Sequence, residues 1–260
     1  MNIFFLSLCI KRCAKYHFDK HVIKMILELC QLLSCAYYTD GSTANANANV
    51  VLDDPNDVNV LKEKGLIYKK THYNHPSSKW TRNHINNYMF VVKLGQELCK
   101  EWKFRYNHDI NYKHKCEDML VFLRNNPPKN INKYDILKDK ENPHGFTLPM
   151  PLAMPDELKC VTTDKHKCTV SCCVKSYRKY YMSEMKAHLI SWTKFDPVTK
   201  TRVNIDKPPW FNATNVANNM ALPKSDIVNT KIVMCDSVKK NGEKCSNKAK
   251  KNGKCGVHSK

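Results

Sequence analysis

Two histidines, two lysines and a glutamate gather on one stripe of a predicted helix near the start of the chain. In the segment YHFDKHVIKMILELCQ, which begins at residue 16, winding at about 100° per residue places His17, His21, Lys24 and Glu28 within about 60° of one another. Lys20 flanks this stripe. Imidazole, amine and carboxylate groups carry out proton transfer, amine chemistry and phosphate binding. The alternative is an ordinary solvent-exposed helix face that contains a few histidines.

An apolar face on the opposite side of this helix predicts how the stripe is positioned. Its residues are Ile23, Ile26, Leu29, Cys30 and Leu33. We therefore predict a helix over residues 12–38 that buries one side in a core. Residues 2–8 are apolar and precede it, and we expect them to form a short extended hook or strand.

A second group of polar and aromatic residues precedes and begins another predicted helix. The candidates for nucleic-acid binding in this group are Lys69, His72, His75, Arg82 and Asn86. Pro76 suits the first turn of a helix, which we predict to run to about Tyr106. Arg82 and Asn86 would share one face of it, where a guanidinium and an amide can contact phosphates or base edges. The alternative is that Thr71 and Asn74 cap the start of the helix and that Arg82 pairs with a carboxylate.

The rest of the chain predicts a mainly α-helical, compact domain over residues 1–211. We expect a loop at 39–60, helices at 113–125 and 171–193, and a proline-rich ordered segment at 126–156 that wraps the core. Residues 212–233 are rich in Asn, Ala and Ser and are expected to form a linker. Residues 234–260 are predicted to form a separate small module.

Four potential metal ligands define this small module. Cys235, Cys245, Cys255 and His258 are separated by nine, nine and two residues. Three thiolates and one imidazole complete a tetrahedral Zn²⁺ site. The segment has few apolar residues, so it needs a metal to hold a fold. A closed set of four ligands leaves no open position, so we expect structural zinc and no cofactor for catalysis. The alternative is a disordered basic tail with incidental cysteines.

The charge of the chain predicts a polyanionic partner. Lys and Arg number 43 against 24 Asp and Glu, which gives a formal net charge of +19. Such an excess favours nucleic acid, in first place DNA, although a basic protein without this specialisation would share it. We expect no membrane span, because no apolar run approaches the length required. The 13 cysteines would suggest disulfides in a small secreted chain, but this chain is too long for that class and its start has no convincing secretory signal. We therefore expect reduced cysteines and a reducing compartment, cytoplasm or nucleus.

The order of these features resembles the phage endonuclease V type pyrimidine-dimer DNA glycosylases. The residues that carry the resemblance are the Asn2–Leu8 hook, the histidine- and lysine-bearing helix with Glu28, the His75-Pro76 turn followed by Arg82, and Pro209-Trp210-Phe211. The chain is still more similar to uncharacterised phage and large-virus proteins with a Tyr-His-x-Asp-Lys-His start. The tail resembles Cys-Cys-Cys-His modules of large DNA viruses, so a host cell or virion is a further expected location.

The resemblance implies a DNA glycosylase with AP lyase activity. An amine would attack C1′ of the damaged nucleotide, and Glu28 would assist base loss and strand cleavage. Because the bulky Asn2 usually prevents removal of the initiator Met, the amine would belong to Met1, or to Lys20 or Lys24. The alternatives are a nucleotide or nucleic-acid modifying enzyme that forms no Schiff base and a non-enzymatic nucleic-acid-binding protein.

Overall fold

The computed structural model describes residues 1–38, 57–160 and 169–211. These residues all belong to the first of the two units into which the chain divides, residues 1–219. The predicted linker and zinc module lie outside the described residues, so both stay predictions.

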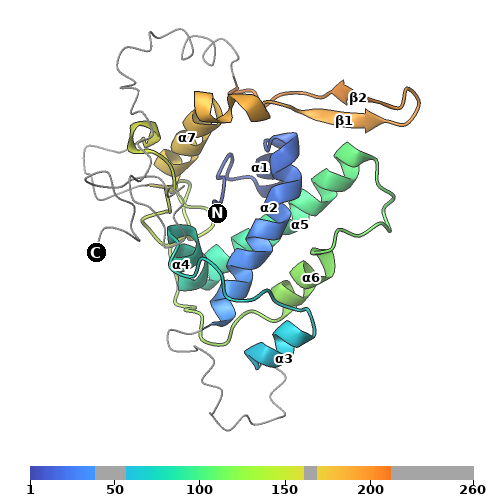
Figure 1. Cartoon of the computed structure of the whole chain (residues 1–260). Coiled ribbons are helices and arrows are strands. Elements are labelled where there is room, and N and C mark those ends of the chain that lie inside the picture. The colour runs from blue at the N-terminus through green and yellow to red at the C-terminus, as the bar shows by residue number, and fades with distance from the viewer. Residues whose placement is uncertain (39–56, 161–168, 212–260) are drawn as a thin grey trace, which may run out of the picture. The chain divides into compact units, whose positions relative to one another are not determined.

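The described part of the first unit is mainly helical (Figure 1), which confirms the predicted fold class for this part. No helix in these ranges is both long and apolar enough to cross a membrane. The helices, 3₁₀ helices (η) and strands are, in chain order, α1 (Ile10–Lys15), α2 (Asp19–Ser34), η1 (Cys35–Tyr37), α3 (Val58–Glu63), α4 (Pro76–Asn83), α5 (Ile85–Tyr106), α6 (Glu117–Asn125), η2 (Asp156–Leu158), α7 (Val170–Tyr181), η3 (Glu184–Leu189), β1 (Thr193–Asp196) and β2 (Thr201–Asn204).

The core forms where α2 packs against α5, two helices that lie side by side in Figure 1. The predicted apolar face of α2 is buried, with the exception of Ile23, which is 40% exposed. The N-terminal hook forms neither helix nor strand, and it turns at Phe5, where the backbone N–H of Leu6 donates to the carbonyl oxygen of Phe4 at 3.0 Å. Its four consecutive side chains from Ile3 to Leu6 are all buried, and the ring of Phe5 stacks on Phe90 of α5 at 5.4 Å. The hook therefore runs through the core and not over its surface.

The helix predicted over residues 12–38 is interrupted, which corrects that prediction. α1 ends at Lys15 and α2 begins at Asp19, so His17 lies in the connection. The buried guanidinium of Arg105 holds this connection by donating to the carbonyl oxygens of Lys15 (2.7 Å) and His17 (2.9 Å). It also donates to Oδ1 of Asp19 at 2.8 Å. Carbonyl groups at the end of α1 thus find a tertiary partner, and no further helical turn is needed to satisfy them.

The second long helix is also broken, although its predicted ends at Pro76 and Tyr106 are confirmed. α4 and α5 are separated by His84, whose backbone is extended (φ −152°, ψ 147°). Its ring Nδ1 accepts a hydrogen bond from the backbone N–H of Asn86 and so caps the start of α5. Arg82 consequently lies on α4, a separate short helix, and not on the long helix α5.

The remaining elements differ from the predictions mainly at their ends. α3 begins at Val58, within the predicted loop, and α6 begins at Glu117 and not at residue 113. The helix predicted to reach residue 193 ends at Tyr181 and is followed by η3 and the antiparallel β1–β2 hairpin. Residues 126–155 contain no helix or strand yet bury Phe146 and Met150, as expected of an ordered segment that wraps the core.

Candidate active site

Three residues of the predicted stripe share one face of α2. His21 is buried, whereas Nζ of Lys24 forms an ion pair with Oε1 of Glu28 at 3.2 Å. The side chain of Glu28 is 15% exposed and that of Lys24 is 66% exposed. Lys20 also stands in solvent. The carboxylate is therefore largely covered by protein, and its lysine partner covers it from the solvent side.

His21 is held as a neutral imidazole. Its Nδ1 lies 2.6 Å from the hydroxyl of Tyr181, and its ring stacks on Phe4 of the hook at 4.6 Å. Burial lowers the pKa of His21 to about 2, and the charges of neighbouring groups, His17 first and then Lys186, add to the shift. Burial also raises the pKa of Tyr181, so its hydroxyl keeps a proton to share with Nδ1. At neutral pH this histidine can hydrogen-bond or relay a proton, but it carries no charge for a phosphate.

His17 precedes α2 and is buried, yet its ring lies close to that of His21, because both rings contact Phe4 and Tyr181. Its Nδ1 hydrogen-bonds with the carbonyl oxygen of Cys13 at 2.8 Å, and its Nε2 is buried without a hydrogen-bond partner among the described residues. Burial lowers the pKa of His17 to about 4. The prediction that one helix carries both histidines is wrong, since His17 precedes α2, but the two imidazoles lie near each other as the prediction required.

His75 lies within electrostatic reach of both the N-terminal amine and Glu28. Burial lowers the pKa of His75, the positive charges of the N-terminal amine and of His72 lower it further, and the negative charge of Glu28 opposes them. These four groups therefore share one electrostatic environment. Nδ1 of His75 also accepts a hydrogen bond from the backbone N–H of Ser77 at 3.2 Å and caps α4. Because Nδ1 is occupied by this capping hydrogen bond, Nε2 is the ring nitrogen of His75 that could take part in proton transfer.

Hydrogen bonds to Asn2 fix the position of the N-terminal residue. The Asn2 amide donates to the carbonyl oxygen of Ala153 at 3.0 Å, and the Tyr177 hydroxyl donates to Oδ1 of Asn2 at 3.2 Å. Met1 itself is half-buried and packs against the core. The amine of Met1 is thus held by anchors from the segment 126–156 and from α7.

Lys186 of η3 is a further amine near the stripe. Its Nζ lies 4.7 Å from the ring centroid of Tyr180 and 5.5 Å from that of Phe4. Burial lowers the pKa of Lys186, the charge of Lys24 lowers it further, and the charge of Glu28 opposes this. The site consequently combines the hook, α2, the turn before α4 and the segment after α7.

The predicted nucleic-acid-binding residues occupy different environments. Arg82 stacks on the ring of Tyr73 at 3.7 Å and donates to the carbonyl oxygen of the same residue at 2.6 Å. Lys70 lies over that ring too, at 4.2 Å. Lys69 and His72 are exposed. Half-buried Arg82 is thus held rigidly beside the turn that leads to His75.

Asn86 is already engaged within the fold. Its amide donates to the carbonyl oxygen of Gly145 at 2.9 Å, where Gly145 has φ +62°. This bond fastens the wrapping segment to α5. The amide of Asn86 is therefore occupied by a contact within the protein. The prediction that placed Asn86 on one helical face with Arg82 did not include this hydrogen bond.

Sequence reasoning missed the residues that α7 and η3 contribute. The sequence predicted a helix over this region but did not single out Tyr180, Tyr181 or Lys186 as site residues. The aromatic residues at 177, 180 and 181 were a usable signal, because three hydroxyl-bearing rings on one helix face suit a polar rather than a purely apolar neighbour. Lys186 had no local signal, since nothing near it in the sequence distinguishes it from the other lysines.

The predicted zinc ligands Cys235, Cys245, Cys255 and His258 lie outside the described residues. Within the described ranges, no group of three or more His, Cys, Asp or Glu side chains is arranged to hold a metal ion.

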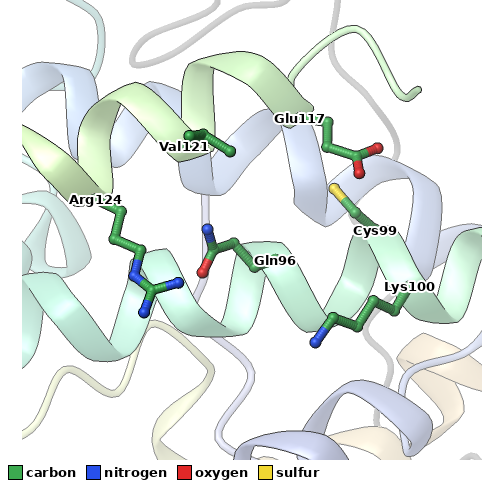
Figure 2. A pocket seen from close by; sticks show the side chains of 6 residues that line it. All are labelled: Gln96, Cys99, Lys100, Glu117, Val121 and Arg124. Atoms are coloured by element: carbon green, nitrogen blue, oxygen red, sulfur yellow. The ribbon is translucent and has the colours of Figure 1, made fainter. Parts of the chain in front are cut away.

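A separate pocket lies between α5 and α6, as Figure 2 shows. Its lining residues are Gln96, Cys99, Lys100, Glu117, Val121 and Arg124. None of them belongs to the α2 stripe or to the turn before α4. The pocket is therefore distinct from the candidate active site.

Comparison with protein families confirms the resemblance over the first part of the chain. Residues 1–114 match the family model described as pyrimidine dimer DNA glycosylase. The match includes the hook, α2 with Glu28, and the turn that carries His75, whereas α7 and η3 lie beyond it. Comparison with curated proteins and with solved structures found no match.

Proposed function

We propose that the chain is a DNA glycosylase that removes damaged or modified bases through an amine nucleophile and Glu28, and then cleaves the strand as an AP lyase. The family match suggests DNA glycosylase activity and hence binding to DNA. The observation that carries the finer proposal is the position of Glu28, a largely covered carboxylate on α2 whose charge acts on both His75 and Lys186.

The surrounding residues support this chemistry. A neutral amine near Glu28 can attack C1′, while the carboxyl group transfers protons during base loss and strand cleavage. His21 is neutral and fits a proton relay or a hydrogen bond to the substrate. Arg82, held on Tyr73, fits a phosphate clamp. The exposed Lys69 and His72 would extend DNA contacts along the same turn.

Reductive trapping tests the proposal directly. The purified protein is mixed with a labelled duplex that contains one abasic site, with and without sodium borohydride. We expect a covalent protein–DNA adduct with borohydride and strand cleavage by β-elimination without it. The same duplex lacking the abasic site is the control.

The other outcomes distinguish the alternative functions. Base or strand chemistry without a trapped adduct would identify an enzyme that forms no Schiff base. Binding with neither adduct nor cleavage would identify a nucleic-acid-binding protein, and either result would overturn the glycosylase proposal.

DNA binding is expected to weaken steeply with salt. With a net charge of +19, contacts to six or more phosphates would lower affinity by roughly 10³ or more between 50 and 200 mM salt. Fluorescence anisotropy of a labelled duplex across this range measures the slope. An affinity that stays flat would argue against a nucleic-acid partner.

Zinc in the C-terminal module is a separate proposal. We propose one structural Zn²⁺ bound by Cys235, Cys245, Cys255 and His258. Metal analysis of the purified protein should find about one zinc per chain, and Cys245→Ser should lose it. Cys9→Ser, which changes an exposed cysteine, is the control and should keep the metal. An equimolar zinc content that survives deletion of residues 234–260 would contradict the proposal.

A further inference from the structure

The β1–β2 hairpin is docked against the C-terminal end of α5. The backbone N–H of Thr193 donates to the carboxylate of Asp19 at 3.1 Å, and the guanidinium of Arg202 lies over the ring of Tyr106 at 4.5 Å. Nε of Arg202 also donates to Oγ1 of Thr193 at 2.6 Å. Figure 1 shows the hairpin on the side of the fold where α5 ends, and β1 contacts that helix. The hairpin is therefore held in place by the fold, and it lies beyond the residues that match the family model.

Phe104 presents an accessible aromatic ring beside this hairpin. It lies on α5 and is 53% exposed. Nζ of Lys194, on β1, lies 5.6 Å from the centroid of its ring, which is within the range of a cation–π contact. The hairpin thus places an ammonium group next to a ring that solvent can reach.

The same ring borders a pocket between α1 and α5. The pocket has a volume of about 240 Å³, and Lys11 and Lys15 line it from α1. Both lysines are exposed, and they share one face of α1 because they are four residues apart. Nη2 of Arg105 donates to the carbonyl oxygen of Lys15 at 2.7 Å and so holds this end of α1 against α5. Because pockets for drug-sized ligands usually begin at roughly 300 Å³, this one suits a single planar ring.

The lysines around this pocket carry positive charge that its carboxylates do not neutralise. The two carboxylates in its lining are already in ion pairs, one with Lys100 at 2.6 Å and the other with Arg105 at 2.7 Å. Lys11, Lys15 and Lys194 therefore remain available to a negatively charged partner. An accessible ring among cations is the combination with which proteins bind single-stranded nucleic acid, since bases stack on the ring and cations follow the backbone.

We propose that the surface formed by Lys11, Lys15, Phe104 and Lys194 binds an unpaired segment of a DNA strand. One base would stack on Phe104, and the three lysines would contact phosphates on either side of it. An unpaired strand fits better than a duplex, because a paired base is already stacked on its neighbours and has no free face for a protein ring.

The chemistry of the surface and the family match favour DNA over an acidic protein. Acidic side chains would use the lysines but leave the ring of Phe104 without a stacking partner, whereas a nucleotide uses both. The family match also implies DNA binding. The inference goes beyond the proposed function, because it adds a second binding surface away from Glu28 and needs no glycosylase chemistry.

Fluorescence anisotropy of the full-length protein with a labelled oligothymidylate of about ten nucleotides tests the role of the ring. Phe104→Leu keeps an apolar side chain but removes the stacking face, so affinity should fall about 5-fold or more, the lower end of what stacking on one ring contributes. Phe104→Tyr keeps a ring and is the matched control, which should bind like the wild-type protein. Thermal unfolding of both variants should match the wild type, because position 104 is exposed.

The salt dependence of the same binding tests the lysines. Each phosphate contact on a single strand contributes about 0.7 to the slope of log affinity against log salt concentration. Lys15→Gln should therefore make the slope shallower by about that amount. Lys62→Gln removes the same charge from an exposed position of α3 outside this surface, and it should leave the slope unchanged.

Several results would overturn the proposal. These are no binding of the oligothymidylate by the wild-type protein, wild-type affinity in Phe104→Leu, and equal slopes in Lys15→Gln and Lys62→Gln. Polyglutamate that displaces the oligonucleotide at equal concentration of charge would assign the surface to an acidic protein instead. The borohydride test is independent, because a missing adduct would end the glycosylase proposal and leave ring-dependent binding of the oligothymidylate standing.

Discussion

Glu28→Gln is expected to lower the rates of base release and strand cleavage by on the order of 10² or more, because a group that transfers protons typically contributes 10²–10⁴. The change removes the carboxylate that pairs with Lys24 and acts on His75 and Lys186, yet it keeps the shape of the side chain. Single-turnover kinetics on a duplex with one damaged base measure the effect. DNA affinity should fall little, since the lost charge is negative.

Glu97→Gln is the matched control for this variant. Glu97 on α5 has a side chain that is 19% exposed and pairs with Lys100 at 2.6 Å, an arrangement close to that of Glu28 and Lys24. It is not part of the candidate active site, so its loss should leave the rates unchanged. Equal losses in both variants would mean that the effect on Glu28 is structural. Full activity in Glu28→Gln would remove Glu28 from the mechanism.

Arg105→Met is expected to lower the free energy of unfolding by about 3–5 kcal/mol, the usual cost of removing one partner from a buried ion pair. Arg105 is fully buried and donates to Oε1 of Glu101 (2.7 Å) as well as to Oδ1 of Asp19 (2.8 Å). Its loss would leave two buried carboxylates and two backbone carbonyls without this donor. Denaturant unfolding measures the change. Arg124→Ala, at an exposed arginine of α6, should change the unfolding free energy little.

The loss in Arg105→Met should depend on pH. Burial would raise the pKa of Asp19, but hydrogen bonds from Ser191, Thr193 and Arg105 hold it below its usual value. The stabilisation from this carboxylate is therefore complete above the unfolded pKa of about 3.9. It is lost as the pH falls through the lower pKa of the folded state. The difference in unfolding free energy between Arg105→Met and the wild-type protein should therefore shrink at that low pH. A difference under about 1 kcal/mol at neutral pH would show that Arg105 is dispensable for stability.

Several features could be predicted because they depend on neighbours along the chain. The spacing of His21, Lys24 and Glu28 places them on one helical face whatever the helix packs against. Pro76 marks the start of a helix because its ring suits the first turn. The burial of the N-terminal hook could be predicted because a short apolar run between polar residues is stabilised by leaving water. The family resemblance rested on these same local patterns, and it holds over residues 1–114.

The interruptions of both long helices could not be predicted from local patterns. Residues 12–38 have continuous helical periodicity, but Arg105 binds the carbonyl of His17 from 88 positions away. The break takes His17 out of the helix, and its ring reaches the neighbourhood of His21 from the connection before α2. His84 likewise ends one helix and caps the next through its ring. In each case a side chain satisfies backbone groups that a continuous helix would have paired internally.

The sequence by itself determined the composition of the α2 stripe, because helical geometry converts spacing directly into a shared face. Only the tertiary structure decided what surrounds Glu28. It covers the carboxylate, brings His75 within electrostatic reach of Glu28 and of the N-terminal amine, and places Lys186 of η3 against the rings of Phe4 and Tyr180. The physical reason is that burial and charge proximity depend on segments that are distant in the chain, and these two quantities govern which amine is free to react.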